Sequence, residues 1–352
     1  MDILQKNMHH IDFEEVDITE VSIDGQTATE FINNIINETF ENEGTREYKQ
    51  KSDYTEVISI IKEIIRHEEI ENQDDTGNGE VAVAIDTKAL TNRIAEKLME
   101  SEIKAQEEIA SIGKIRKGSL IQALAKSNEN TYRYVLIKVD HSAYLDKNDL
   151  VKRIGLPLEE KILKSCIIEY NLNKDINRIS LFDSTKKMAN YWWNKLLELE
   201  PIRTDDLNTK TAMRKIKGTI KKVVETNSPS DYTIYNDKLK GYFNTREEFD
   251  IEEMISTVID GHNTKDQSVD TDILKEKIRS VALKTFDGQF KIDLSAIKND
   301  KVEVYKLDER ISLTLYDEIG NLPDKIIAEE NGGEYSLRLV GISKDIYDKF
   351  NY

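Results

Sequence analysis

The sequence predicts a mixed α+β protein with a helical, acidic N-terminal part, a central sheet with helices and a C-terminal antiparallel β-meander. Its 352 residues, of which 38% are hydrophobic, are enough for two or three domains with real cores. Apolar residues recur mainly at helical spacing up to residue 110, whereas short apolar runs typical of strands begin near residue 119 and return after residue 300. These changes predict three domains, at 1–110, 111–245 and 246–352.

The first predicted domain is acidic and mainly helical. Residues 1–110 contain 27 Asp and Glu against 10 Lys and Arg, a net charge of −17, so the rest of the chain, with 40 of each sign, is neutral overall. Apolar periodicity and turn residues predict a strand at 16–23, helices at 27–43, 53–69 and 87–110, and a loop at 71–80. A low overall isoelectric point therefore does not exclude a polyanionic partner for the remainder, because attraction depends on local potential.

The second predicted domain is an α/β domain built on apolar strands. Strands are predicted at 119–125, 132–140, 164–171 and 177–184, and the segment 149–157 ends in residues that stop local structure. Ser184 is a suitable N-cap for a helix over 185–200, which Pro201 ends. We interpret Trp192 and Trp193 in that helix as core anchors rather than base-stacking platforms.

The third predicted domain passes from helices to strands. Helices are predicted at 246–260 and 271–286, and strands at 301–307, 310–318, 324–330 and 334–342. Asn331-Gly332-Gly333 joins the last two strands and is a strong hairpin signal. Consecutive hairpin-linked strands indicate an antiparallel meander.

Motifs for cofactors and metals are weak in this sequence. Gly113 to Ser119 begins like a phosphate-binding loop, but Ser119 and Leu120 stand where that loop needs Lys and Ser or Thr. The five histidines have no zinc-ligand spacing, and we interpret the adjacent His9 and His10 as a frayed terminus. Cys166, the single cysteine, lies in an apolar run and is expected to be buried. We therefore predict neither a cofactor nor a metal.

The same features favour the cytosol and leave one enzymatic alternative open. A single cysteine excludes an internal disulfide framework, and the start of the chain has neither a basic nor an apolar signal region. No segment is apolar for long enough to span a membrane, and no membrane partner is expected. Asp293, Glu303 and Lys306 approximate a metal nuclease at the wrong spacing. No catalytic residue is assigned, and a metal-dependent nuclease stays an alternative.

The most informative segment is TAMRKIKGTIKKVVE, residues 211–225. On a helix, its apolar side chains from Met213 to Val224 form one stripe, and its basic side chains lie off that stripe. Such a cationic face suits a phosphate backbone, because neutralised phosphates release counterions. GKIRKG (113–118) and the pair at 186–187, at a predicted helix start, add further cations. The candidate DNA-binding residues are Lys114, Arg116, Lys117, Lys186, Lys187, Lys210, Arg214, Lys215, Lys217, Lys221 and Lys222.

A family resemblance covers roughly residues 111–342. It rests on GSLIQALA, YRYVLIKVD, DLVKRIGLP, KSCIIEY and ISLFDSTKKMANYWWNKLLELEP, followed by DDLNTK, and on FDGQFKID, RISLTLYDEI and KIIAEENGGEYSLRLVGI. The segment from Tyr144 through Asp149, Leu150, Arg153 and Ile154 to Leu156 matches the family's Y-x-DL-x-x-RI-x-L element. In these segments the chain resembles bacterial nucleoid-associated proteins of the NdpA (YejK) type. Leu197-Glu198-Leu199 departs from the family's Phe-Leu-Gly style ending.

The resemblance implies a DNA-associated protein and supplies no catalytic residues. The leading hypothesis is a non-enzymatic, double-stranded DNA-binding protein of the cytoplasm and nucleoid, homo-oligomeric, with phosphate contacts that are mostly independent of sequence. The alternative is a phage-defence or regulatory interaction protein. Its acidic N-terminal part would then bind a basic partner or fold back over the cationic helix.

Overall fold

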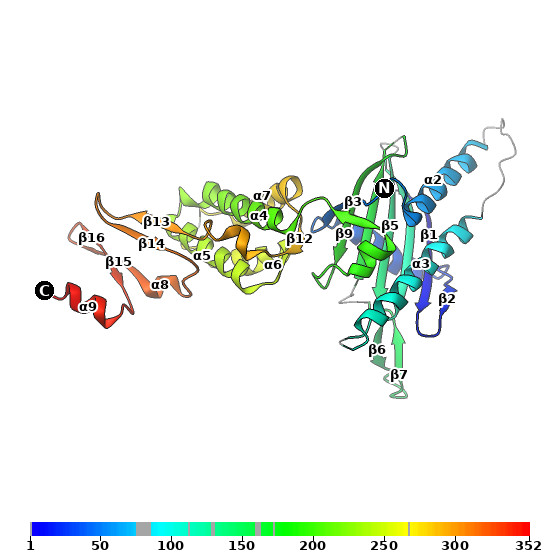
Figure 1. The fold of residues 1–352 in the computed structure, drawn as a ribbon, viewed down its shortest axis with the longest axis horizontal. Helices are drawn as coiled ribbons and strands as arrows, with labels where there is room; N and C mark the ends of the chain where they lie inside the picture. The colour runs from blue at the N-terminus through cyan, green and yellow to red at the C-terminus, as the bar shows by residue number, and fades with distance from the viewer. Residues whose placement is uncertain are drawn as a thin grey trace. The chain divides into compact units, whose positions relative to one another are not determined.

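The computed structural model describes residues 2–74, 86–111, 113–127, 131–158, 163–171, 173–266 and 268–352. It divides into two compact units (Figure 1). Unit 1 comprises Met1–Thr204 and Asp287–Phe290, and unit 2 comprises Asp205–Phe286 and Lys291–Tyr352. The predicted mixed α+β class is confirmed, because the chain contains both a large antiparallel sheet with helices and a helical unit with small sheets.

Unit 1 is built on an eight-stranded sheet in the order β10-β3-β9-β8-β5-β4-β1-β2, in which every neighbouring pair is antiparallel. The adjacent strands β4 (Gly118–Lys126) and β5 (Tyr132–Asp140) are nine residues long and paired along their whole length, as their apolar runs predict. The strands are β1 (Asp2–Asp12), β2 (Asp17–Glu20), β3 (Arg46–Gln50), β4 (Gly118–Lys126), β5 (Tyr132–Asp140), β8 (Leu163–Tyr170), β9 (Ile176–Asp183) and β10 (Leu199–Pro201).

Helices cover both faces of this sheet, which explains why its central strands are buried on both sides. Along β4, Leu120 and Leu124 face one apolar core, and Ile121 and Ala123 face the other, as the two-residue period of a strand requires. The first core is closed by α2 (Glu56–Asp74), α3 (Thr87–Ile109) and the π-helical turn η1 (Tyr191–Leu196). The second core is closed by α1 (Gln26–Glu41).

Two features of unit 1 differ from the sequence-based expectation. The predicted helix 185–200 is reduced to η1, because Asp183 accepts hydrogen bonds from the amide and hydroxyl of Thr185 and so holds residues 184–187 in a turn. Trp192 in η1 is nonetheless fully buried, and Trp193 packs partly buried beside it, which confirms them as core residues. The segment predicted at 149–157 is the second half of a hairpin, β6 (Ser142–Leu145) with β7 (Lys152–Gly155).

A buried group of charges lies inside the first core of unit 1. The Lys138 ammonium lies 2.6 Å from Glu102 Oε1 and 3.3 Å from Asp140 Oδ1, and it donates to the Arg116 carbonyl at 2.8 Å. Burial is the largest single influence and lowers the pKa of Lys138, but Glu102, Tyr191 and Asp140 together outweigh it, and the pKa ends well above its ordinary value. Within the described residues, the oxygens of Glu102 have no further hydrogen-bond partner. Lys138 is therefore the counter-ion on which this carboxylate depends.

Unit 2 starts as a helical bundle and continues as two separate hairpins. Its helical elements are α4 (Asp205–Ile220), η2 (Lys221–Glu225), α5 (Pro229–Thr245), α6 (Ile251–Met254), η3 (Ile255–Asp260), α7 (Thr271–Thr285), η4 (Leu294–Ile297), α8 (Leu322–Lys325) and α9 (Lys344–Phe350). Its strands are β11 (Glu248–Asp250), β13 (Glu303–Lys306), β14 (Ser312–Leu315), β15 (Ile326–Asn331) and β16 (Glu334–Leu339), while β12 (Gln289–Lys291) contains the boundary between the units.

The predicted hairpin at Asn331-Gly332-Gly333 is confirmed, because Gly332 and Gly333 have φ of 63° and 89° and connect β15 to β16. The predicted continuous meander is wrong: β13 pairs with β14 and β15 pairs with β16, and α8 lies between the two pairs. The turn residues Asn331-Gly332-Gly333 were sufficient to predict the hairpin of β15 and β16. They carried no information on whether this hairpin pairs with the hairpin of β13 and β14.

The predicted domain boundaries at 110/111 and 245/246 are also wrong. β1 pairs with β4 and β3 pairs with β9, so strands from residues 1–110 complete the same sheet as those from 118–183. The boundary instead lies next to α4, which belongs to unit 2. The division into units follows from strand pairing between distant segments. The difference in charge along the chain carries no information about that pairing. Residues 75–80 of the predicted loop at 71–80 lie outside the described residues. Residues 71–74 are helical and not a loop, because α2 continues to Asp74.

Candidate nucleic-acid interface

The basic segment 211–225 forms the second half of α4 and the π-helical turn η2, and one side of it is buried as predicted. Met213, Ile216, Ile220 and Val224 have no exposed surface, and Val223 is partly exposed. The apolar stripe therefore fixes this helix in the core of unit 2 and leaves its basic side chains outside. The helical register read from the sequence is confirmed.

Three of these basic side chains have acidic partners within unit 2. Arg214 pairs with Asp300 at 2.8 Å, and Lys217 forms a hydrogen-bonded ion pair with Glu303. Lys221 lies 3.7 Å from Glu225, one turn along the same element. Asp300 and Glu303 each lie 86 residues from their partners in sequence, so the helical pattern gave no indication of these pairs. These three cations are already partly neutralised, which makes them weaker phosphate ligands than predicted.

The other three basic side chains of the helix are not engaged in ion pairs within the described structure and could contact a phosphate. Lys210, Lys215 and Lys222 are exposed. Among the residues that the structure describes, no carboxylate lies within ion-pair distance of any of them. Lys215 and Lys222 are seven residues apart, about two helical turns, which places them on nearly the same side of the helix. We define Lys210, Lys215 and Lys222 as the open lysines.

The GKIRKG segment of unit 1 is covered by acidic side chains. Lys117 lies 2.7 Å from both Asp12 and Glu14, and Lys114 lies 2.5 Å from Glu14. Arg116 is exposed. Gly118 serves strand packing rather than a phosphate loop, because a Cβ there would lie 2.5 Å from the Val139 carbonyl oxygen.

The lysines at 186 and 187 lie in a turn and not at a helix start. Lys186 has φ of 66°, and Lys187 is exposed. The helix-dipole argument for an anion at this position is therefore wrong, since η1 begins only at Tyr191. The cations of this turn and of GKIRKG belong to unit 1, whereas the open lysines belong to unit 2.

A cluster that the sequence did not reveal joins two histidines through a buried serine. His10 Nδ1 lies 2.6 Å and His141 Nε2 lies 2.7 Å from Ser119 Oγ. His10 belongs to β1, so its interpretation as a frayed terminus is wrong. His9 points to the opposite face, where it is buried near Gln122, as alternation along a strand requires. The register of β1 against β4 brings the cluster together, and local sequence carries no sign of it.

This cluster makes unit 1 sensitive to acid. Burial lowers the pKa of His10, and burial together with His10 and Lys138 lowers the pKa of His141 against the opposite effect of Asp140 and Asp12. Because folding lowers both pKa values, the unfolded chain binds protons more readily than the folded chain does. The stabilisation present above pH 6.5 is therefore lost as the pH falls toward the pKa values of the folded state. We expect the urea midpoint, followed by tryptophan fluorescence, to fall between pH 7 and 5 and to fall less in the variant His10→Gln/His141→Gln. An equal fall in both proteins would contradict this assignment.

A Ser-Asp-His group in unit 2 is structural. Asp231 accepts from Ser228 Oγ at 2.6 Å, lies 2.7 Å from His262 Nε2 and accepts from the amides of Lys265 and Asp266. Burial raises the pKa of Asp231, but these hydrogen bonds lower it to about 2. Both partners bind the carboxylate and neither is hydrogen-bonded to the other, so the group fixes the loop after η3 to the start of α5 and does not activate a nucleophile.

The residues of the nuclease hypothesis have other partners. Asp293 caps η4 by accepting from Ser295, and Glu303 is engaged by Lys217. In the described ranges, no group of three or more His, Cys, Asp or Glu side chains is placed to hold a metal ion. Each helix in the described part of the chain is too short or too polar to traverse a bilayer. Comparison of the chain with protein-family models, curated proteins and solved structures finds no match.

Proposed function

We propose that this protein binds double-stranded DNA through phosphate contacts made by the open lysines of α4 and η2. The observation that carries the proposal is that Lys210, Lys215 and Lys222 are exposed on a helix whose opposite side is fully buried. Nothing in the described structure neutralises them. Lysine in this setting is a mobile point charge, which suits a phosphate backbone better than the edge of a base.

The phosphate backbone fits these residues better than an acidic protein surface does. A duplex presents regularly spaced phosphates with condensed counterions, and each lysine that neutralises a phosphate releases counterions. The helix supplies no aromatic side chain among its exposed residues that could stack on an unpaired base. The binding we propose is therefore tolerant of sequence and strongly dependent on salt.

The first test is an electrophoretic mobility shift with unrelated duplexes of equal length, in the presence of chelator and then of magnesium or manganese. We expect retardation of every duplex at low salt, equal competition between sequences and intact DNA in each metal. Absence of retardation at low salt would refute the proposal, and metal-dependent cleavage would favour the nuclease alternative.

A second function is favoured by one observation: acidic residues at the end of β1 and in the turn that follows cover the GKIRKG segment. Asp12 and Glu14 bind Lys117 and Lys114, as an internal competitor for phosphate would. We propose that this contact limits DNA binding by unit 1. It would act as a regulatory element within the chain.

Neutralising the two carboxylates tests whether they limit DNA binding. In Asp12→Asn/Glu14→Gln, we expect DNA affinity at low salt to rise by about threefold to tenfold and the salt slope to steepen by about 2, because two lysines become available. The matched control is Glu330→Gln/Glu334→Gln, which makes the same change in net charge in unit 2 and breaks no ion pair among the described residues. An equal rise in both variants would show that net charge, and not the cover, sets the affinity.

A further inference from the structure

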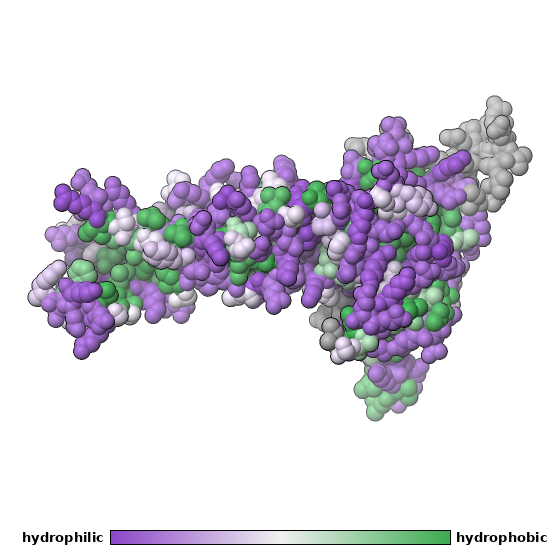
Figure 2. Space-filling model, in the orientation of Figure 1, coloured by the Kyte–Doolittle hydropathy of each residue, from purple (hydrophilic) through white to green (hydrophobic). Residues whose placement is uncertain are grey.

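The hairpin of β6 and β7 in unit 1 is exposed along nearly its whole length. It forms a two-stranded sheet of its own, and Figure 1 shows it extending past the end of the eight-stranded sheet. Every residue from 142 to 154 except Asp146 is exposed, and apolar side chains gather at the end of the hairpin (Figure 2). Its large apolar side chains are Tyr144, Leu145, Leu150, Val151 and Ile154. A separate hairpin with such a surface has the composition of an element that contacts another molecule.

The turn of this hairpin holds two of these apolar side chains in a fixed conformation. Leu150 has φ of 53°, in the left-handed region that leucine rarely adopts, and it is 73% exposed. Its amide donates to the Asp146 carbonyl at 2.8 Å, and the Asp146 amide donates to the Val151 carbonyl at 3.0 Å. The Val151 amide donates to Asp149 Oδ1 at 3.0 Å. These hydrogen bonds maintain the strained turn, so Leu150 and Val151 are presented together at the tip.

The uncompensated charge of the hairpin is positive. Arg153 lies 3.2 Å from Asp146 Oδ2 and 2.7 Å from Asp149 Oδ2, so one arginine engages both carboxylates of the turn. Lys147 and Lys152 are exposed. Among the residues that the structure describes, no carboxylate lies within ion-pair distance of either lysine. The two lysines flank the apolar tip on its two sides in sequence and remain free to bind an anion.

The base of the hairpin adjoins the GKIRKG segment. The His141 amide donates to the Lys117 carbonyl at 2.9 Å, and β6 begins at the next residue, Ser142. Arg116 of the GKIRKG segment is exposed and has no ion-pair partner in the described ranges. The cations of the hairpin therefore continue the segment of unit 1 to which we assigned a regulated phosphate contact. This continuity favours the same polyanion, duplex DNA, as the molecule that the hairpin contacts.

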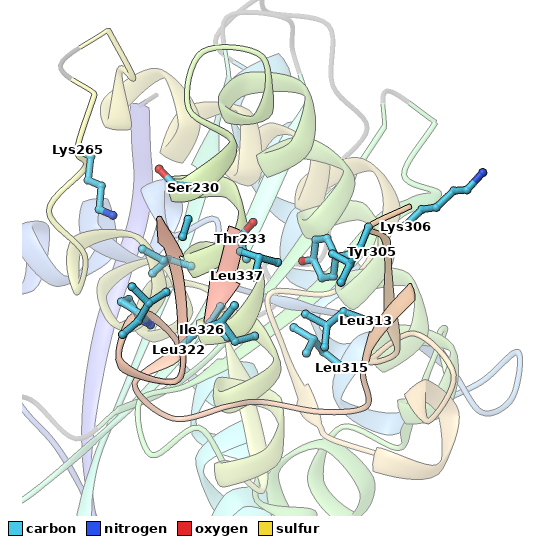
Figure 3. Close-up of a pocket in the computed structure, with 15 residues that line it drawn as sticks. Ser230, Thr233, Lys265, Tyr305, Lys306, Leu313, Leu315, Leu322, Ile326 and Leu337 are labelled. Carbon is cyan, nitrogen blue, oxygen red and sulfur yellow. The ribbon is translucent and has the colours of Figure 1, made fainter. Parts of the chain in front are cut away.

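The apolar side chains of the hairpin form a projection and not a hollow. In unit 2 the opposite arrangement is seen, because Leu313, Leu315 and Leu337 line a cavity of about 590 Å³ (Figure 3). A two-stranded ribbon fits a groove of a duplex, and apolar wedges inserted between base steps unstack them and kink the DNA. The phosphates that border the groove are suitable ligands for lysines beside the wedge.

We propose that the β6–β7 hairpin is a DNA-bending arm that places Leu150 and Val151 between two stacked base pairs. Its phosphate contacts are made by Arg116, Lys147 and Lys152. A strand of four residues, such as β6, spans about 13 Å. This exceeds the depth of the minor groove, about 7.5 Å, so the tip reaches the base pairs while the base of the hairpin stays at the phosphates. The inference rests on the proposed function and adds a second contact surface and an activity to it.

Energy transfer between dyes on the two ends of a duplex of about 20 base pairs measures the bending. We expect saturating wild-type protein to raise the transfer efficiency and Leu150→Ser/Val151→Ser to remove most of that rise. The salt slope of this variant should stay that of wild type, because neither side chain neutralises a phosphate. The matched control is Val304→Ser/Leu307→Ser in unit 2, where the side chains are 65% and 48% exposed, and we expect it to bend DNA like wild type.

The possible outcomes separate the arm from the proposed function. Wild-type binding that leaves the duplex straight, or an equal loss of bending in the control, would overturn the arm and leave DNA binding intact. Absence of any binding at low salt would overturn both. If Leu150→Ser/Val151→Ser bends DNA normally but loses self-association in sedimentation or binding to anionic lipid vesicles, the hairpin contacts a second copy or a membrane surface, and the arm is refuted.

Neutralising the two lysines tests the phosphate contacts of the arm. In Lys147→Gln/Lys152→Gln, we expect the slope of log K against log salt to become shallower by about 2, because two phosphate contacts are lost. A slope equal to that of wild type would show that the hairpin does not follow the DNA backbone.

Discussion

Replacing Lys215 and Lys222 by glutamate is expected to lower the affinity for DNA by on the order of tenfold or more at low salt. These two residues have no acidic partner in the described structure, so each reversal removes a phosphate ligand and adds a charge that repels the backbone. The slope of log K against log salt should become shallower by about 2, since each lysine accounts for about one released counterion. Fluorescence anisotropy with a labelled duplex across a salt series measures both quantities.

The matched control is Lys277→Glu/Lys284→Glu on α7. This pair is also exposed, also seven residues apart and also in unit 2, and it changes the net charge by the same amount. We expect it to keep most of the affinity and the slope of wild type. Equal losses in the two variants would mean that the whole field of the protein, and not the open lysines, attracts DNA.

Replacing Lys138 by methionine is expected to destabilise unit 1 by about 3–5 kcal/mol. Methionine conserves much of the volume of the lysine stem but leaves Glu102 and Asp140 buried without their counter-ion. Urea unfolding followed by tryptophan fluorescence reports on this unit, because Trp192 and Trp193 both belong to it. Adding Glu102→Gln should restore part of the loss, since it removes the unpaired charge.

The control for this prediction is an exposed ion pair in the same unit. Lys49 lies 3.0 Å from Glu200, and their side chains are 61% and 47% exposed. Lys49→Met should change the free energy of unfolding by less than about 1 kcal/mol, as is usual for a surface pair. If Lys138→Met has an effect as small as Lys49→Met, the buried group does not hold the core of unit 1 as described.

Local sequence patterns predicted much of the fold because helices and central strands depend on nearby residues. The stripe from Met213 to Val224 and the paired apolar runs that became β4 and β5 could be read directly. Strands β1 and β3 were missed because polar residues interrupt their apolar alternation, as in Arg46-Glu47-Tyr48-Lys49 of β3. Their partners in the sheet stabilise them more than their own propensity does.

The candidate site was predicted only in part, because its electrostatics depend on residues distant in sequence. The sequence showed which side chains of the basic helix point outward, but not that Asp300 and Glu303 engage Arg214 and Lys217. It likewise gave no sign that Asp12 and Glu14 lie on GKIRKG. Of the six basic side chains on this helix, three pair with carboxylates and three remain as the open lysines. The open lysines are therefore the residues whose substitution tests DNA binding.

The central claim is that the open lysines bind phosphates, and the salt dependence of wild-type binding tests it most directly. A plot of log K against log salt for any duplex should be linear, with a slope of about −3 if Lys210, Lys215 and Lys222 each neutralise one phosphate, and steeper if unit 1 contributes. The slope should be the same for unrelated sequences. An affinity that does not change with salt, or no detectable binding at low salt, would contradict the account.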